Sequence, residues 1–242
     1  MPVYHLGRWP VFPPVEHADA SGLLAVGGDL STERLLTAYR QGIFPWFEPG
    51  EAILWWSPDP RLILEPEGLQ VSRSLRATWR QGRFEVRVDT SFARVVQSCA
   101  VAKRKGEQGT WISPEVERAY TELHQRGYAH SVESWHEGEL VGGLYGMSLG
   151  RCFFGESMFA NEPDASKIAL VALVELLKAR DVGLIDCQVP TEHLLRMGAR
   201  EVPRSEFLRR LDEALRFPDQ REPWTWAPSS RGVIGNQGTN LA

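Results

Sequence analysis

The sequence lacks any long apolar run and any export signal. No stretch of eighteen consecutive apolar residues occurs, whereas a helix that crosses a bilayer needs about 20. The first residues, MPVYHLGRWPVFPPVEHAD, do not place an apolar segment behind a basic start, which is the pattern of a signal peptide. We therefore predict no membrane-spanning helix, no signal peptide and no membrane partner.

Cysteine is scarce as well. The three cysteines, Cys99, Cys152 and Cys187, are odd in number, lie far apart and form no CxxC or clustered Cys/His pattern. That usage fits reduced thiols in a cytoplasmic protein and gives no indication of a metal site. We also find no internal repeat in the sequence.

The composition is that of a globular protein with one large domain or two small ones. The chain has 242 residues, of which 43% are hydrophobic and 24% are charged. We expect a small turn-rich N-terminal domain over residues 1–60, a regular domain over residues 61–217 and a tail over residues 218–242. The segment after Arg231, GVIGNQGTNLA, has no core-forming periodicity and is expected to be loose.

Hydrophobic periodicity and capping residues predict a mixed α+β sheet. In the N-terminal part, Ser31 is expected to cap a short helix that runs from Thr32 to Gln41. In the larger part, consecutive antiparallel strands precede an amphipathic helix and a further strand, an order that indicates a mixed sheet with flanking helices. The predicted strands are 61–64, 84–88, 130–135, 139–147, 151–158 and 184–189, and the predicted helices are 91–102, 114–125, 166–180 and 205–217.

Residues 42–64, GIFPWFEPGEAILWWSPDPRLIL, combine tryptophan and proline at high density. Three tryptophans, Trp46, Trp55 and Trp56, stand among four prolines. Because proline fixes φ and lacks an amide donor, we expect short rigid turns here and neither one long helix nor a central strand. Such an aromatic platform suits stacking against a flat ligand such as a nucleobase. An aromatic plug between two domains is the alternative interpretation.

The net charge of −4 hides a basic region. Residues 61–105 hold ten Lys and Arg against four Asp and Glu, an excess of six that leaves −10 on the remainder. Four of these arginines, Arg73, Arg76, Arg80 and Arg83, recur at helical spacing in a helix that opens at Ser72 or Ser74. A solvated helix face is one explanation, but the local excess favours binding of a polyanion such as a nucleic-acid backbone.

Three polar residues interrupt otherwise apolar strands. Asp186 and Gln188 lie two residues apart in LIDCQV, so they should share one face of the strand while Cys187 points away into the core. Glu156 lies in FFGESMF. Burial of a carboxylate is costly unless it is paired or faces a wet cleft. Each acid could serve structure alone, yet two acids and an amide in neighbouring strands favour a functional site.

The chain resembles the bacterial leucyl/phenylalanyl-tRNA–protein transferases. The resemblance runs in family order from Gly22 to Arg204 and covers about three quarters of the chain. One departure is Asp164, where the family more often has Asn, and we expect the added charge to be tolerated beside the helix N-terminus. The matching blocks are GLLAVGGDLS, GIFPWF, LWWSPDPR, SRS, GTWI, HSVESW, LVGGLYG, GESMF, ASK, LIDCQV and GAREVPR.

The resemblance implies a fold and a reaction. The fold is a small N-terminal domain followed by an acetyltransferase-like (GNAT) domain. The reaction moves Leu or Phe, and less well Met, from aminoacyl-tRNA to the α-amino group of proteins that begin with Arg or Lys, which tags them for N-end-rule degradation. Such an enzyme needs no cofactor and no metal, works in the cytoplasm and is expected to be a monomer.

The resemblance also implies roles for individual residues. Trp46 and Trp111 look like the pair that holds the terminal adenosine. Arg73, Arg76 and Arg80 would contact the tRNA backbone, and an apolar pocket of Leu144, Phe153 and Met158 would take the Leu or Phe side chain. Glu156, Asp186 and Gln188 would form the catalytic centre, with the division of roles among them left open.

Two other functions fit parts of the sequence. One is an acetyl-CoA-dependent N-acetyltransferase of the same fold, although MFANEPDASK lacks the glycine-rich loop that holds pyrophosphate before a helix. The other is a non-catalytic RNA-binding module, which would use the aromatic and basic residues and leave Glu156, Asp186 and Gln188 without a chemical role.

Overall fold

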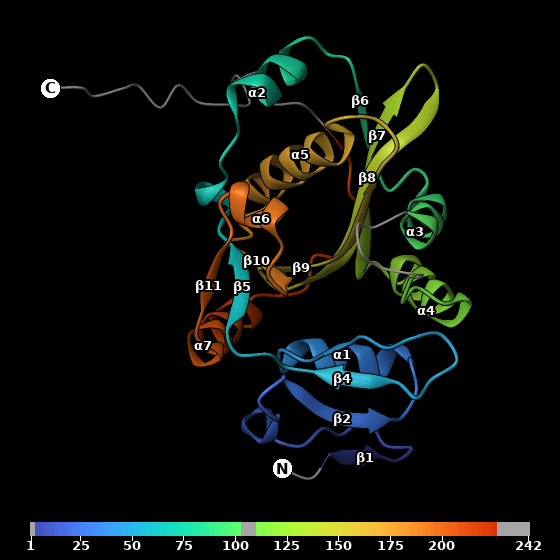
Figure 1. Cartoon of the computed structure of the whole chain (residues 1–242), viewed down its shortest axis with the longest axis vertical. Coiled ribbons are helices and arrows are strands. Elements are labelled where there is room, and N and C mark those ends of the chain that lie inside the picture. Colours follow the sequence, from blue (N-terminus) through green and yellow to red (C-terminus); the bar gives the residue numbers. More distant parts are fainter. Residues whose placement is uncertain (1–2, 103–109, 227–242) are drawn as a thin grey trace, which may run out of the picture.

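The chain folds around two β-sheets, a small one near the N-terminus and a larger one that carries most of the helices (Figure 1). The computed structural model describes residues 3–102 and 110–226. The two sheets follow one another along the chain, since the last strand of the small sheet ends at Trp56 and the first strand of the large sheet begins at Arg61. The predicted division near residue 60 agrees with this order, but the domain boundaries themselves stay a prediction.

The small sheet has four strands in the order β1-β2-β4-β3. Their bounds are Tyr4–Leu6, Leu23–Gly27, Leu54–Trp56 and Phe44–Pro45 in that order. Helix α1, Thr32–Arg40, begins where it was predicted, and the Ser31 side chain accepts a hydrogen bond from the Arg34 amide. A short 3₁₀ helix, Val15–His17, lies between the first two strands.

The expectation that residues 42–64 contain no central strand was wrong. Strand β4 is an inner strand of the small sheet, paired with β2 on one side and β3 on the other. The prolines do not prevent this, because β4 itself contains none. Pro45 lies on β3, an edge strand, where a missing amide donor costs no ladder bond.

The large sheet has seven strands in the order β11-β5-β10-β9-β8-β7-β6. Only β9 and β10 pair in parallel, and the other neighbours are antiparallel, so the predicted α+β class with a mixed sheet is confirmed. The strands span Arg61–Leu64 (β5), Glu85–Val88 (β6), Ala129–His136 (β7), Glu139–Leu149 (β8), Cys152–Ala160 (β9), Leu184–Gln188 (β10) and Arg200–Val202 (β11).

Helices cover both faces of the large sheet (Figure 1). On one face lie α2 (Arg73–Arg80), α5 (Ala165–Ala179) and α6 (Glu192–Arg196), and on the other lie α3 (Phe92–Val101), α4 (Pro114–Gln125) and α7 (Arg204–Leu215). A second 3₁₀ helix, Pro66–Gly68, follows β5. All predicted helices are present, whereas α6, β11 and the four strands of the small sheet were not predicted. None of the helices in the described part of the chain is both long and apolar enough to cross a bilayer.

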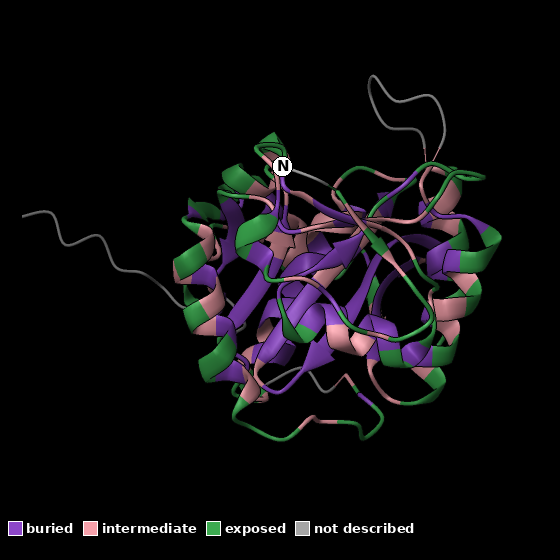
Figure 2. Cartoon of the chain, turned by 90° about the horizontal axis from the view of Figure 1, so that it is seen from below, coloured by how far each residue is buried: buried purple, intermediate pink, exposed green. Residues whose placement is uncertain are grey.

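Helix α5 is buried on most of its circumference. Ten of its residues are buried, including seven consecutive ones, 168–174, that no single helix face could hold. The prediction of an amphipathic helix was therefore wrong, because α2 and the sheet cover it from different sides. Figure 2 shows the same distribution for the described residues, with buried residues in the strands and inner helices and exposed residues at the periphery.

The first part of the predicted tail packs on the sheet. Trp224 is 2% exposed, and its ring stacks on His130 of β7 with centroids 3.8 Å apart. Residues 218–226 are therefore part of the folded unit, because a large aromatic ring in the core holds them. The segment after Arg231, which was predicted to be loose, lies outside the described residues.

Candidate functional site

A pocket opens where β9 and β10 separate. The two strands pair in parallel over three residues each, ending at Phe154 and Asp186, and beyond that point no pairing joins them. The gap leaves one edge of each strand facing open space within the sheet. Part of α5, the segment leading into α6 and the end of β3 close the remaining sides.

The pocket encloses about 370 Å³, which lies within the usual range for a small-molecule site. Seven of the predicted site residues line it, although they are spread over more than 140 positions of the chain. These seven are Trp46, Trp111, Leu144, Glu156, Phe153, Met158 and Gln188. Asp186 and the three arginines of α2 are not part of the lining.

The interior of the pocket is apolar, as predicted. Leu144 and Met158 face each other across β8 and β9, and Leu170 and Leu173 of α5 extend the same surface. Phe153 is fully buried and forms the floor. A β-bulge with glycine at position 146 makes room for its ring, since a Cβ at that position would lie 2.7 Å from the ring carbons.

Tryptophan 46 forms an exposed aromatic surface at the pocket mouth. It is 44% exposed, and the Trp56 indole donates a 2.6 Å hydrogen bond to its backbone carbonyl. Trp55, in contrast, is fully buried and donates to the Gly27 carbonyl. Trp55 thus belongs to the core around the small sheet, whereas Trp46 remains exposed at the pocket.

Glu156 is the carboxyl group that reaches the pocket. It is 9% exposed, and both of its oxygens accept hydrogen bonds from buried tyrosines. Tyr39 donates to Oε1 at 2.7 Å, Tyr120 donates to Oε2 at 2.9 Å, and the amide of Gln188 adds a third bond at 3.1 Å. Burial raises the pKa of Glu156 to about 7, against the opposing effect of these donors. The group can thus gain or lose a proton near neutral pH.

Asp186 faces away from the pocket and pairs with Arg61. The guanidinium donates two bonds, of 2.8 and 2.6 Å, and both side chains are fully buried. Arg61 also donates to the Gly42 carbonyl and lies between the rings of Phe44 and Phe207. The carboxylate is therefore part of a structural ion pair that joins β5 to β10.

The expected alternation along β10 was wrong. Cys187 was predicted to point away from the site, yet it lines the pocket together with Gln188. The register shifts between Asp186 and Gln188, and Gln188 has a left-handed φ of +63°. That bend turns Gln188 out of the period-2 pattern and toward Glu156, while Asp186 holds it in place by accepting its backbone N–H at 2.9 Å.

Sequence reasoning missed four residues at or behind the pocket. Tyr39 and Tyr120 could not be recognised from the sequence, because they occupy buried positions of α1 and α4 where any core aromatic residue could stand. Arg61 was counted among the basic residues, but its strand, RLIL, gave a signal, since a charged residue in a buried strand needs a partner. His193 lines the pocket from α6, a short helix that was not predicted.

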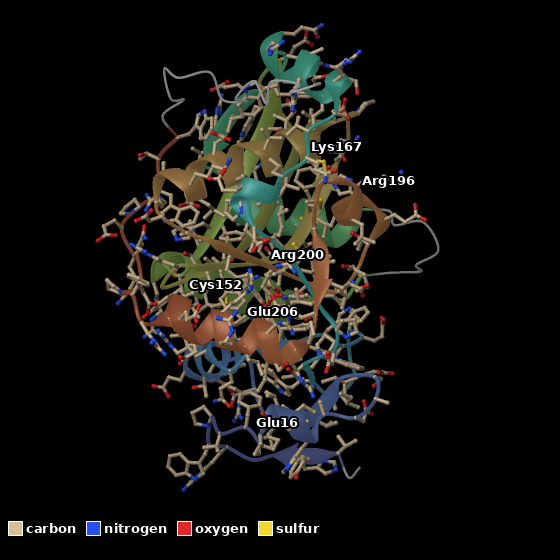
Figure 3. The ribbon with its side chains drawn as sticks, turned by 90° about the vertical axis from the view of Figure 1, so that its left-hand side faces the viewer. Glu16, Cys152, Lys167, Arg196, Arg200 and Glu206 are labelled. Atoms are coloured by element: carbon tan, nitrogen blue, oxygen red, sulfur yellow. The ribbon has the colours of Figure 1, made fainter. Side chains whose placement is uncertain are left out.

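Two cations lie near α6, and each is paired with an acid, Lys167 with Asp164 and Arg196 with Glu192. Lys167 of α5 and Arg196 of α6 lie on the same side of the molecule (Figure 3) and, after burial, are the main causes of the lowered pKa of His193. Lys167 also forms a 2.7 Å ion pair with Asp164, which adopts a left-handed φ of +70° before α5. Asn and Asp tolerate that conformation better than other side chains, so the departure from Asn at position 164 is accommodated.

The arginines of α2 form a separate basic surface. Ser72 caps the helix, and Arg73, Arg76 and Arg80 form no ion pair with any other described residue. Arg83 does not belong to this stripe, because the helix ends at Arg80 and Arg83 forms a 2.7 Å ion pair with Glu162. Lys103, Arg104 and Lys105, which contributed to the predicted basic region, lie outside the described residues.

Within residues 3–102 and 110–226, no cluster of three or more His, Cys, Asp or Glu side chains could hold a metal ion. Cys187 is a free thiol whose pKa is raised by burial, so it favours the protonated form. The carboxyl of Glu156 and the amide of Gln188 are two polar groups of the lining that are hydrogen-bonded to each other.

Comparisons with known proteins agree with the resemblance in the sequence. The family model described as leucyl/phenylalanyl-tRNA protein transferase matches residues 63–212, and the model of that family's N-terminal domain matches residues 28–59. Among solved structures, a GCN5-related N-acetyltransferase from Kribbella flavida has a TM-score of 0.36 and 12% identity, covering 70% of this chain and 59% of that one. That structural likeness is too distant to support an argument.

Relatives with the name leucyl/phenylalanyl-tRNA–protein transferase are similar over nearly their whole length. The protein of Anaeromyxobacter dehalogenans is 58% identical over 93% of this chain and 96% of its own. The protein of Nitrosomonas europaea is 58% identical over 88% and 91%, and that of Myxococcus xanthus is 56% identical over 93% and 97%. The chain therefore belongs to the leucyl/phenylalanyl-tRNA protein transferase family.

Proposed function

We propose that this protein transfers Leu or Phe, and less well Met, from aminoacyl-tRNA to the α-amino group of proteins that begin with Arg or Lys. The observation that carries the proposal is one pocket with an aromatic mouth, an apolar interior and a carboxyl group at the boundary between them. These three features correspond to the adenosine, the amino-acid side chain and the reacting ester of a charged tRNA end. The protein product would be tagged for N-end-rule degradation.

The tRNA end enters with its adenosine between Trp46 and Trp111. Stacking on aromatic rings is tolerant of sequence and is worth about 1–3 kcal/mol per base. The esterified Leu or Phe then extends inward to Leu144, Phe153 and Met158. Because the aminoacyl side chain and the adenosine are both held, the ester that joins them is fixed beside Glu156.

The chemistry requires a neutral amine and a stabilised tetrahedral intermediate. An α-amino group has a pKa of about 7.7–8.0 and is mostly protonated at pH 7. Glu156, with its pKa near 7, takes the proton from the incoming amine. Gln188 donates to the developing oxyanion. Asp186 acts behind them, since its bonds to Arg61 and to the Gln188 backbone hold Gln188 in its unusual conformation.

The remaining features follow from this reaction. Aminoacyl esters are already activated, so the transfer uses no cofactor, and positioning alone can supply about 7–11 kcal/mol. Charged tRNA and reduced thiols both suit the cytoplasm, and the pocket is completed by a single chain, which suits a monomer. The rival N-acetyltransferase activity lacks support, because residues 161–164 before α5 contain no glycine for a pyrophosphate loop.

The acyl donor that the protein uses distinguishes an aminoacyltransferase from an N-acetyltransferase and from a non-catalytic RNA-binding module. The protein is incubated with an N-terminal Arg peptide and either labelled leucyl-tRNA or labelled acetyl-CoA. We expect label on the peptide from leucyl-tRNA only. Label from acetyl-CoA would indicate an N-acetyltransferase, and binding of leucyl-tRNA without any peptide label would indicate a non-catalytic RNA-binding module.

Removal of one arginine from α2 is expected to weaken tRNA binding in a salt-dependent manner. Arg76→Ala and Arg80→Ala should each reduce the slope of log K against log salt by up to about one unit, because each contact with a phosphate releases a counterion. Binding is measured between low and moderate salt. Arg209→Ala on α7, an exposed arginine paired with Glu213, is the control. Unchanged slopes in both α2 variants would mean that these arginines face solvent and do not contact tRNA phosphates.

Amino-acid choice is expected to follow the shape of the apolar pocket. The pocket should prefer Leu and Phe, tolerate Met, and disfavour the β-branched Ile and Val by about 1–3 kcal/mol. Phe153→Ala should reduce Leu transfer and admit bulkier side chains. Because Phe153 is fully buried, Met158→Ala at a half-buried position is the second variant. One tRNA charged in turn with Leu, Phe, Met, Ile, Val and Trp provides the measurement, and equal transfer of Ile and Leu by the wild type would contradict this assignment.

A further inference from the structure

Two buried tyrosines and Glu156 form a closed triangle of hydroxyl and carboxyl oxygens. Tyr39 comes from α1 next to the small sheet, Tyr120 from α4, and Glu156 from β9. Each tyrosine contacts one carboxyl oxygen of Glu156, and the two phenol oxygens contact each other. Both tyrosines are fully buried, and neither lines the pocket, so Glu156 is the member of the triangle that meets a ligand.

The number of protons determines how many of the three contacts are hydrogen bonds. With Glu156 ionised, only the two phenol protons are available, so one of the three oxygen–oxygen contacts has no proton between its atoms. With Glu156 protonated, three protons are available and all three contacts can be hydrogen bonds in one circular direction. The ring can therefore hold the carboxyl group in either state, through two charge-assisted hydrogen bonds to the carboxylate or three neutral ones with the protonated group.

Among the described residues, the groups with the largest effects on the pKa of Glu156 include no positive charge that would favour its ionised form. Gln188 on β10 donates its amide to the carboxyl group, and Tyr145 on β8 packs edge-on against one of the phenols. The nearest negative charge is Asp186 on β10, which repels a second carboxylate. The cation of this region, Arg61 on β5, is already occupied by Asp186. Burial accordingly raises the pKa of both tyrosines as well as that of Glu156.

We propose that Tyr39 and Tyr120 are positioning residues of the transfer reaction, which close a hydrogen-bonded ring around Glu156 and make that carboxyl group a store for one proton. The proposal rests on the proposed function for the identity of the reaction. It also assigns a part in the chemistry to the N-terminal region, because Tyr39 lies on α1.

The proton passes through the ring in balanced steps. The Glu156 carboxylate takes one proton from the α-ammonium group of the acceptor, and this proton completes the third hydrogen bond of the ring. The neutral amine attacks the ester carbonyl carbon, the C–N bond forms, and the bond from that carbon to the ribose oxygen breaks. Glu156 gives its proton to the ribose oxygen and receives the proton that the nitrogen loses. Release of this last proton to water restores the carboxylate.

The protonation of Glu156 can be measured without any substrate. The C=O stretching band of a protonated carboxyl group is followed by infrared difference spectroscopy of the full-length protein as the pH changes, with Glu156→Gln as the blank. We expect a band that disappears with a midpoint of about 7 in the wild type. In Tyr39→Phe and Tyr120→Phe the midpoint should rise by about one pH unit, since a bond to the charged carboxylate is lost and such bonds are stronger than neutral ones.

A matched control removes a phenol hydroxyl elsewhere. Tyr4→Phe deletes a hydroxyl on β1 that bonds to His17 of the first 3₁₀ helix, and it should leave the midpoint unchanged. Both Tyr39→Phe and Tyr120→Phe are measured, so that the midpoint can still be compared with the wild type if one of the two variants fails to fold. A wild-type midpoint near the ordinary value of about 4.3 for Glu, or an unshifted midpoint in the folded ring variants, would overturn the proposal.

The pH profile of transfer connects the ring to the reaction. In single-turnover transfer from leucyl-tRNA, the rate falls at acidic pH as Glu156 becomes protonated. In Tyr39→Phe and Tyr120→Phe this fall should occur at a higher pH, by the same number of pH units as the infrared midpoint. A merely structural defect would instead lower the rate at every pH. Absence of transfer in the wild type, together with the expected infrared shift, would refute the proposed function and leave the ring intact. Normal transfer with an unshifted acidic limb would refute the ring and leave the function intact.

Discussion

Asp186→Ala is expected to destabilise the protein by about 3–5 kcal/mol, because it leaves the guanidinium of Arg61 buried without its partner. Both side chains are fully buried, and the two charge-assisted hydrogen bonds between them offset the cost of removing the charges from water. Asp186 also accepts the backbone N–H of Gln188, so the variant loses the contact that holds the bend of β10. Denaturant unfolding measures the change in the free energy of unfolding.

A double-mutant cycle separates the pair from its surroundings. Replacing the pair together, as Arg61→Met with Asp186→Leu, should cost less than the sum of the two single changes, because neither charge is left unpaired. Strictly additive changes in the free energy of unfolding would contradict the assignment of a structural ion pair. Any loss of transfer in Asp186→Ala is therefore interpreted only at temperatures where the variant remains folded.

Glu156→Gln is expected to reduce the single-turnover rate of transfer by about 10²–10⁴-fold, the usual contribution of a general base. The substitution keeps the size of the side chain and its place in the pocket wall, so affinity for charged tRNA should stay close to that of the wild type. The measurement pairs tRNA binding with transfer to an N-terminal Arg peptide. An equal loss in binding and in transfer would show that Glu156 contributes to tRNA affinity and has no special role in the chemical step.

The same variant should change how stability depends on pH. Since burial raises the pKa of Glu156 from 4.5 to about 7, the folded state holds its proton more tightly than the unfolded state. The free energy of unfolding should therefore fall by up to about 3 kcal/mol as the pH rises from about 4.5 to 7. Glu156→Gln lacks this titration, so the difference between wild type and variant isolates it. A wild-type curve parallel to that of the variant would mean that Glu156 has an ordinary pKa.

The regular part of the fold could be predicted because its elements carry strong local signals. Ser31 and Ser72 both cap helices as expected, and the three long antiparallel strands follow clear apolar patterns. The small sheet escaped prediction since its strands have only two to five residues each, too few for a period to be recognised. The burial of α5 also depends on what packs around it, which its own sequence cannot reveal.

The site could be predicted in its residue types but not in its geometry. Glu156 was identified by its position in an apolar strand, yet its two phenol partners lie 117 and 36 residues away in the chain. No local pattern connects positions so far apart. Asp186 and Gln188 were assigned to one face by the period of a strand, and the bulge between them reversed that arrangement. Seven of the candidate residues line one pocket, whereas their hydrogen-bond partners could be found only from the fold.

The most direct test of the account is the mass of an acceptor peptide after incubation with leucyl-tRNA. One peptide begins with a free Arg, and its matched partner carries the same sequence with the α-amino group acetylated. The account predicts that the first peptide gains one leucyl residue at its N-terminus, that the second gains nothing, and that Glu156→Gln protein slows the gain. Leucine added to the acetylated peptide, or no addition to the free one by folded protein that binds leucyl-tRNA, would contradict transfer to the α-amino group.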